Sequence, residues 1–204
     1  MEGLAREILD LTLEHLWLVF VAMMIAGSVG IGGGILLTRR PSWRGWVLGF
    51  ANVMQTVPSL ALFGFLIPIP FIGGIGKHTA ILALVLYAIL PVLRNTLAGI
   101  LGVDPAVRES AVAMGMNGRQ LLWQVELPLA ARTILAGVRV ATVTTIGTAT
   151  IAAAIGGGGL GVFIFRGLAS VDTTLILAGA IPAAAIALLA DGGLGWVEHK
   201  FSAA

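Results

Sequence analysis

Cysteine is absent from this chain of 204 residues, which excludes a disulfide framework and a thiolate metal site. Histidine is scarce, and His15, His78 and His199 lie in separate segments without metal-ligand spacing. We therefore expect no metal bound by this chain. No grouping of serine, histidine and carboxylate stands out in the sequence either, so we name no catalytic residue.

Charged residues are also few. They make up 11% of the chain, against about 25% in soluble domains, while hydrophobic residues make up 58% and the mean hydropathy is +1.00. The apolar runs are roughly twice as long as the ten-residue strands of a transmembrane barrel. Twenty-eight glycines suit close packing of helices in lipid. The composition predicts an all-α integral membrane protein.

The apolar runs predict five transmembrane helices, because each is near the roughly 20 residues that a spanning helix needs. They lie at about 16–37, 46–67, 79–99, 129–155 and 173–189. We expect residues 1–15 to form an extracytoplasmic N-terminal segment, 16–195 the transmembrane domain and 196–204 a cytoplasmic tail.

Two features inside these runs carry predictions about packing. Ala26, Gly30 and Gly34 recur every four residues and predict a small-residue ridge for close contact with another helix. Pro91 is expected to interrupt the third span, because proline removes a helical hydrogen bond.

The basic residues predict an orientation in the membrane. Five spans place the chain ends on opposite sides. If the loop after the first span is cytoplasmic, nine positive charges lie inside (Arg39, Arg40, Arg44, Arg94, Arg108, Arg119, Arg132, Arg139 and Lys200) and three outside (Arg6, Lys77 and Arg166). We expect the N-terminus outside and the C-terminus in the cytoplasm. Because topology explains the pI of about 9.7, we expect no nucleic-acid partner.

The second span has a polar face. Asn52, Gln55 or Thr56, and Ser59 follow helical spacing, and Pro58 weakens the helix beside them. Polar groups beside a helix break are tolerated at membrane depth where they face protein or a water-filled path. These residues are candidates for lining a translocation path, and interhelical hydrogen bonding is the equal alternative.

Two glycine motifs resemble nucleotide sites without their context. Gly156, Gly158 and Gly161 fit G-x-G-x-x-G but follow an apolar span instead of a soluble strand, which favours a flexible turn. Gly76-Lys77-His78 resembles the end of a P-loop, but position 71 is Phe instead of Gly and position 78 is His instead of Ser or Thr. We expect no cofactor on this chain. Asp191 is the candidate for a proton-coupled carrier, although a helix cap or interfacial residue is the favoured interpretation.

One long polar passage, DPAVRESAVAMGMNGRQLLWQVELP, separates the third and fourth spans. Asp104 can cap a short helix, and Gly115 can end that helix in a left-handed turn. Asn117 and Gln120 form a capping-box pair that opens a second short helix, expected to stop before Pro128. The pattern predicts a helix–turn–helix on the cytoplasmic face.

The spacing within residues 104–128 is specific: Glu109-Ser110-Ala111, three residues, Gly115, nine residues, Val125, one residue, Leu127-Pro128. It resembles the EAA loop, E-A-A-x3-G-x9-I-x-L-P, of permease subunits in ATP-binding cassette (ABC) importers. Ser110 stands for alanine and Val125 for isoleucine. NVMQTVPSLALFGFL (52–66), LYAILPVLRNT (86–96) and IAAAIGGGGLGVFIFRG (151–167) are similar to the osmoprotectant branch, which imports glycine betaine, carnitine or choline.

This resemblance implies a type I ABC importer permease with a cytoplasmic coupling helix, in a bacterial plasma membrane. It also implies a permease homodimer, two cytoplasmic subunits that hold ATP and Mg, and an extracytoplasmic substrate-binding protein. In the family, the EAA loop docks into a groove on the ATPase. By position, that role falls on Glu109, Ser110, Ala111, Met114, Gly115, Leu127 and Pro128.

Two other functions remain open from the sequence. An ABC importer permease for another small solute, such as an amino acid or another betaine, has the same mechanism. A self-sufficient channel or secondary carrier, using the polar face from Asn52 to Ser59, belongs to a different class.

Overall fold

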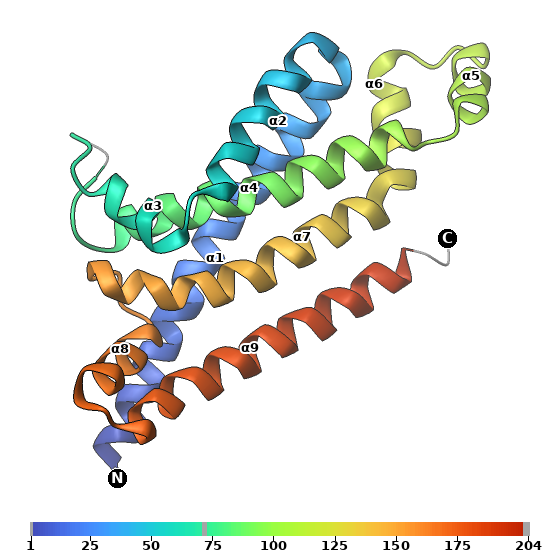
Figure 1. Ribbon diagram of the computed structural model, residues 1–204. Coiled ribbons are helices and arrows are strands. Elements are labelled where there is room, and N and C mark those ends of the chain that lie inside the picture. Colours follow the sequence, from blue (N-terminus) through green and yellow to red (C-terminus); the bar gives the residue numbers. More distant parts are fainter. Residues whose placement is uncertain (1, 71–72, 202–204) are drawn as a thin grey trace.

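The computed structural model describes residues 2–70 and 73–201, and all regular elements in these ranges are helical (Figure 1). Four helices are long and apolar enough to cross a membrane, or five crossings result if one bent pair is a single span. This confirms the predicted all-α membrane fold. The elements are α1 (Glu2–Arg39), α2 (Pro41–Thr56), α3 (Ser59–Leu66), α4 (Lys77–Leu101), α5 (Pro105–Ala113), α6 (Gly118–Leu121), the π-helical turn η1 (Leu122–Glu126), α7 (Leu127–Ala149), the 3₁₀ helix η2 (Thr150–Ile155), α8 (Gly161–Ser170) and α9 (Thr173–Lys200).

The core forms where α1 packs on α4 and α4 packs on α7. A Cβ atom placed on Gly30 would lie 2.8 Å from Cβ of Val92, and one on Gly34 would lie 2.6 Å from Cβ of Thr96. The predicted small-residue ridge is therefore confirmed as the α1 surface against which α4 packs. Small residues permit this approach because no side chain separates the two backbones.

The second apolar run differs from the single span expected at 46–67. Helices α2 and α3 meet at an angle of 103°. Val57 is extended and Pro58 cannot donate a backbone hydrogen bond, so α2 ends at Thr56 and α3 starts afresh at Ser59. Ser59 consequently does not share a helix face with Asn52.

The expected interruption of α4 at Pro91 is wrong, because α4 continues from Lys77 to Leu101 with the proline inside it. Proline removes the bond to the carbonyl four residues earlier, which is that of Tyr87. Gln55 Nε2 on α2 donates to this carbonyl at 3.2 Å. The Tyr87 hydroxyl in turn donates to the carbonyl of Val57. Helix α2 thus supplies a hydrogen-bond donor for the Tyr87 carbonyl, which has no donor within α4 because Pro91 lacks an N–H.

Three other boundaries differ from those expected. Helix α1 begins at Glu2, so it includes most of the segment 1–15, and α9 continues into the predicted tail as far as Lys200. The helix expected to stop at Leu127-Pro128 instead runs as one apolar stretch over Gly118–Ile155. The π turn explains this: the N–H of Leu127 donates to the carbonyl of Leu122, and Pro128 then falls in the first turn of α7, where its missing N–H is tolerated.

At the opposite end of α7, the helix tightens into η2 and then reaches a glycine turn. The N–H of Thr150 donates to the carbonyl of Gly147, and buried His15 Nε2 hydrogen-bonds the carbonyl of Ile146 at 3.1 Å. The turn is confirmed, with positive φ at Gly156, Gly158 and Gly159. Side chains of α1 contact this turn and the helix that leads to it.

Glu14 on α1 supplies the contacts that hold this turn. Its Oε2 accepts from the N–H of Gly159 at 2.9 Å, and its Oε1 lies 2.5 Å from Lys77 Nζ. A Cβ atom on Gly158 would overlap the Glu14 carboxylate. The N-terminal part of α1, the start of α4 and the turn after η2 are therefore joined at one end of the molecule.

Candidate functional site

The helix–turn–helix of α5 and α6 lies at the other end of the bundle, beyond the ends of α4 and α7 (Figure 1). Asp104 Oδ1 accepts from the N–H of Ala106 at 2.8 Å, which confirms the predicted cap of α5. Gly115 has φ of +87°. Its N–H donates to the carbonyl of Val112 at 2.9 Å, and the next N–H donates to that of Ala111 at 3.1 Å. This pair of bonds is a Schellman motif, so the predicted left-handed turn is confirmed.

The capping box that opens α6 is also confirmed. Asn117 Oδ1 accepts from the N–H groups of Arg119 and Gln120 at 3.1 and 3.0 Å, while Gln120 Oε1 accepts from the N–H of Asn117 at 2.9 Å. Both sides of the turn are therefore fixed by local hydrogen bonds. These local hydrogen bonds therefore set the direction of α6 relative to α5.

The predicted coupling residues divide between surface and interior. Glu109, Ser110, Gly115 and Pro128 are exposed, and Leu127 is half-buried. Met114 is 74% exposed, whereas Ala111 is 2% exposed. The side chain of Ala111 therefore packs within its own chain, and its part in any docking contact is to support α5 from behind. Exposed Val112 extends the outer surface of α5.

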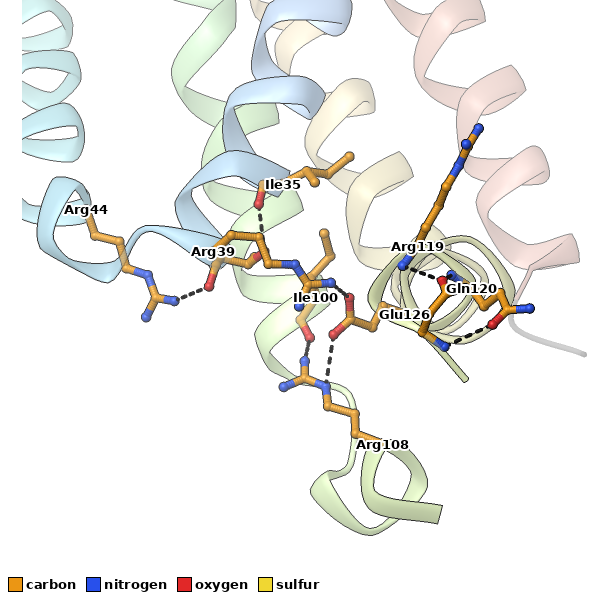
Figure 2. A network of polar contacts seen from close by, with 10 residues as sticks. Ile35, Arg39, Arg44, Ile100, Arg108, Arg119, Gln120 and Glu126 are labelled. Atoms are coloured by element: carbon orange, nitrogen blue, oxygen red, sulfur yellow. Dashed lines mark hydrogen bonds and ion pairs between the residues drawn. The ribbon is translucent and has the colours of Figure 1, made fainter. Parts of the chain in front are cut away.

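A buried ion-pair cluster behind α5 was missed from the sequence. The Glu126 side chain is 2% exposed. Its Oε2 lies 2.5 Å from Nη2 of Arg39 at the end of α1, and its Oε1 lies 3.5 Å from Nε of Arg108 on α5. Arg108 Nη2 also donates to the carbonyl of Ile100 near the end of α4. Figure 2 shows the two guanidinium groups converging on one carboxylate from different elements.

One sequence signal could have indicated Glu126. It precedes Ala130 and Ile134 by four and eight residues, and both are buried in α7. A carboxylate in register with a buried helical face requires a paired cation, because an isolated buried charge is costly. Nearby Arg44 makes different contacts, since its Nε and Nη2 donate to the carbonyls of Leu37 and Thr38 at 2.7 and 3.0 Å and cap α1.

The candidate path residues are not gathered on one surface. Asn52 Oδ1 accepts from Arg94, and Gln55 donates to α4 as described above. The Thr56 hydroxyl donates to the carbonyl of Val53 in its own helix at 2.8 Å. Pro58 is exposed at the bend, and Ser59 is half-buried in α3. Interhelical hydrogen bonding therefore accounts for the first two residues.

Asp191 does not cap a helix, since it lies inside α9. It forms a bidentate pair with Arg139 on α7, with Oδ1 2.6 Å from Nε and Oδ2 2.7 Å from Nη2. Glu198 lies 3.4 Å from Arg139 Nη1 and 3.8 Å from Arg132 Nε. A hollow of about 340 Å³ borders this series of charges. The Asp191 carboxylate is thus paired with the Arg139 guanidinium in this structure.

Within residues 2–70 and 73–201, no group of histidine and carboxylate side chains is placed to hold a metal ion. The assembled features are a bundle of apolar helices and a rigid helix–turn–helix projecting from one end. A buried ion-pair cluster joins this projection to the bundle. They describe a helical membrane protein with a polar helix–turn–helix at one end of its bundle.

The comparisons with known proteins give the family. Residues 30–203 match the family described as "Binding-protein-dependent transport system inner membrane component", and the chain belongs to this family. It is a multi-pass permease subunit of an ABC importer and not itself an enzyme, because the ATPase of such importers is a separate subunit. The predicted family and class are confirmed.

Two curated relatives cover nearly the whole chain. It is 45% identical over 197 residues to the carnitine transport permease protein OpuCB of Listeria monocytogenes, covering 97% of this chain and 89% of the relative. It is 43% identical over 194 residues to the glycine betaine/carnitine/choline transport system permease protein OpuCB of Bacillus subtilis (strain 168), covering 95% and 88%.

A solved structure agrees with the fold. The inward-facing MetNI methionine ABC transporter matches with a TM-score of 0.88 at 20% identity, covering 98% of this chain and 99% of that chain. At this identity the match supports the fold alone. It places the described helices in the architecture of ABC importer permeases.

Proposed function

We propose that this permease forms the translocation path for quaternary-ammonium osmoprotectants such as glycine betaine, carnitine and choline. The observation that carries the proposal is the identity of 45% and 43%, over nearly the whole chain, to permeases named for these solutes. Aromatic cages for such cations need several rings. This chain has one tyrosine, and its five tryptophans are all exposed side chains on the outside of the described helices. We therefore assign the selective cage to the separate binding protein.

The proposed assembly is a permease homodimer with two cytoplasmic ATP-binding subunits and one extracytoplasmic substrate-binding protein. ATP and Mg bind to the ATP-binding subunits. Helix α2 has no buried residue, which leaves a surface for a second permease. Arg39 and Arg44 lie at the same end as Arg108 of α5 (Figure 2), which supports a cytoplasmic coupling end with the N-terminus outside.

We assign the coupling contact to the exposed side chains of Glu109, Ser110 and Met114 and to the turn at Gly115. Ala111 supports this surface from behind, and Leu127-Pro128 leads the chain back toward the membrane. For the translocation path, we propose the region of the α2–α3 bend, where Asn52, Gln55, Thr56, Pro58 and Ser59 lie. Support comes from the exposed Thr56 and Pro58 at a break in an otherwise apolar segment.

Uptake into liposomes tests the proposal. The permease is reconstituted with its ATPase and binding protein, and uptake of labelled glycine betaine, carnitine, choline and methionine is measured. We expect ATP-dependent uptake of the quaternary-ammonium solutes that persists when ion gradients are collapsed. ATP-driven uptake of methionine alone would overturn the substrate assignment. Uptake that follows an ion gradient without ATP would indicate a secondary carrier.

The oligomeric state needs a separate experiment. Two differently tagged copies of the chain are expressed together with the ATPase, and the complex is captured through one tag. We expect the second tag in the captured complex. A complex that contains one copy together with a different permease chain would contradict the homodimer.

A further inference from the structure

We propose that Glu126 is a positioning residue that carries movement of the coupling helix α5 into the membrane bundle. It does so by holding Arg108 of α5 and Arg39 of α1 at the same time. This inference rests on the proposed coupling function of α5, and it assigns the internal contact through which that function operates.

The geometry gives each carboxylate oxygen its own cation. Oε2 of Glu126 faces Arg39, and Oε1 faces Arg108 (Figure 2). Glu126 itself lies at the junction of η1 and α7. One buried carboxylate therefore joins the cytoplasmic ends of α1 and α7 to the short helix that faces the ATPase.

The π turn directs Glu126 inward. Leu121 and Glu126 are five residues apart, and both are buried, at 9% and 2% exposure. In an α-helix, five residues cover about 1.4 turns, so the two side chains would point in different directions. In a π turn, residues five apart are bonded and lie one above the other. The turn thus aligns Glu126 with the buried faces on both of its sides.

Glu126 is the buried member of this cluster, whereas the side chains of Arg39 and Arg108 are 44% and 26% exposed. Loss of either arginine would leave the buried carboxylate with a single cation, which is unfavourable. Arg108 also donates to the carbonyl of Ile100, so α5 is tied to the end of α4 as well. A displacement of α5 would then act on the ends of α1, α4 and α7 through these contacts.

The test compares variants in the complete importer, measuring ATP hydrolysis and solute uptake on the same preparation. For Arg108→Gln and Glu126→Gln we expect an assembled complex whose ATPase rate stays within about twofold of the wild type, while uptake falls about tenfold. Solute moved per ATP is the decisive ratio. Glu126→Asp retains the charge and should restore part of the ratio.

The matched control is Arg44→Gln. Arg44 lies at the same end of the molecule and is partly buried, but its guanidinium donates to the carbonyls of Leu37 and Thr38. Its removal should leave the ratio of uptake to ATP hydrolysis unchanged. A change as large as that of Arg108→Gln would show that the ratio responds to any loss of charge at this end.

Two results would overturn the inference. One is an unchanged ratio in Arg108→Gln, whose side chain is 26% exposed and therefore easier to replace than buried Glu126. The other is a parallel loss of ATP hydrolysis and uptake, in proportion to the assembled complex, which would mark a purely structural contact. If Glu126→Gln does not assemble, Arg108→Gln decides alone. Absence of ATP-driven uptake in the wild type would refute the proposed function instead.

Discussion

At the scale of single residues, Gly115 and Gly118 differ in backbone conformation although both lie in the turn between α5 and α6 or at its edge. Gly115 has φ of +87°, while Gly118 begins α6 and is not among the described residues with positive φ. A Cβ atom on either would meet nothing within 4 Å. Any difference between their substitutions therefore reports backbone conformation and not crowding.

We predict that Gly115→Ala lowers uptake and destabilises the turn by about 1–2 kcal/mol, because an L-residue is strained in the left-handed region. Gly115→Asn should be milder, since asparagine tolerates that region. Uptake and the apparent Tm of the purified complex provide the measurement. Gly118→Ala is the control and should behave like the wild type. Equal loss in both alanine variants would mean that the left-handed turn is not the cause.

A second residue-scale prediction concerns Gln55, which bonds the Tyr87 carbonyl that Pro91 leaves without a helical partner. Gln55→Leu should destabilise the permease by about 0.5–1.5 kcal/mol, the usual net contribution of one hydrogen bond. Thermal unfolding in detergent measures this change. Thr56→Val is the control, because Thr56 bonds within its own helix. If Thr56→Val costs as much, the link between α2 and α4 is not the origin.

Local chemistry explains which of these details were predictable. The hydrogen bonds at Asp104, at Gly115 and between Asn117 and Gln120 join groups at most five residues apart, so short sequence patterns predicted them. Glu126 pairs with Arg39 across 87 residues, and His15 meets Ile146 across 131. No local pattern contains those partners. Sequence reasoning therefore counted Arg39 and Arg108 as surface charges that report orientation.

At the scale of elements, local sequence alone did not determine whether a proline ends its helix. Pro58 was expected to weaken its helix, but the 103° angle depends on α3 burying Leu62, Phe63 and Leu66 in the core. Pro91 did not break α4, because α2 supplies Gln55. The two prolines have the same local chemistry and opposite outcomes, since tertiary packing decides between bending and continuity.

The contact of α1 with α4 gives a prediction at this scale. Gly30→Leu should destabilise the bundle by about 1–3 kcal/mol, because the new side chain would overlap Val92 and force the helices apart. Gly32→Leu is the matched control on the same helix, where a Cβ atom meets nothing within 4 Å. The apparent Tm and yield of the assembled complex are compared. Similar losses in both variants would show that α1 does not depend on this ridge.

At the scale of the whole molecule, each end has its own polar junction. Glu14 joins α1 to Lys77 and to the glycine turn at one end, while Glu126 joins α1 to α5 and α7 at the other. Helix α1 takes part in both. A rigid α1 that contacts both junctions gives the bundle a structural element through which the two ends can respond together.

The orientation of the molecule gives the last prediction, and the absence of cysteine makes it measurable with single substitutions. Val171, between α8 and α9, is 90% exposed, and Gln124, in η1, is also exposed. One crossing, α7, separates these two sites. A membrane-impermeant maleimide should label Val171→Cys in intact cells but Gln124→Cys only after permeabilisation, because the bias of nine positive charges to three predicts that the end with η1 lies inside. The cysteine-free parent should remain unlabelled. The reverse pattern would invert the proposed topology, and labelling of both sites from one side would contradict a crossing by α7.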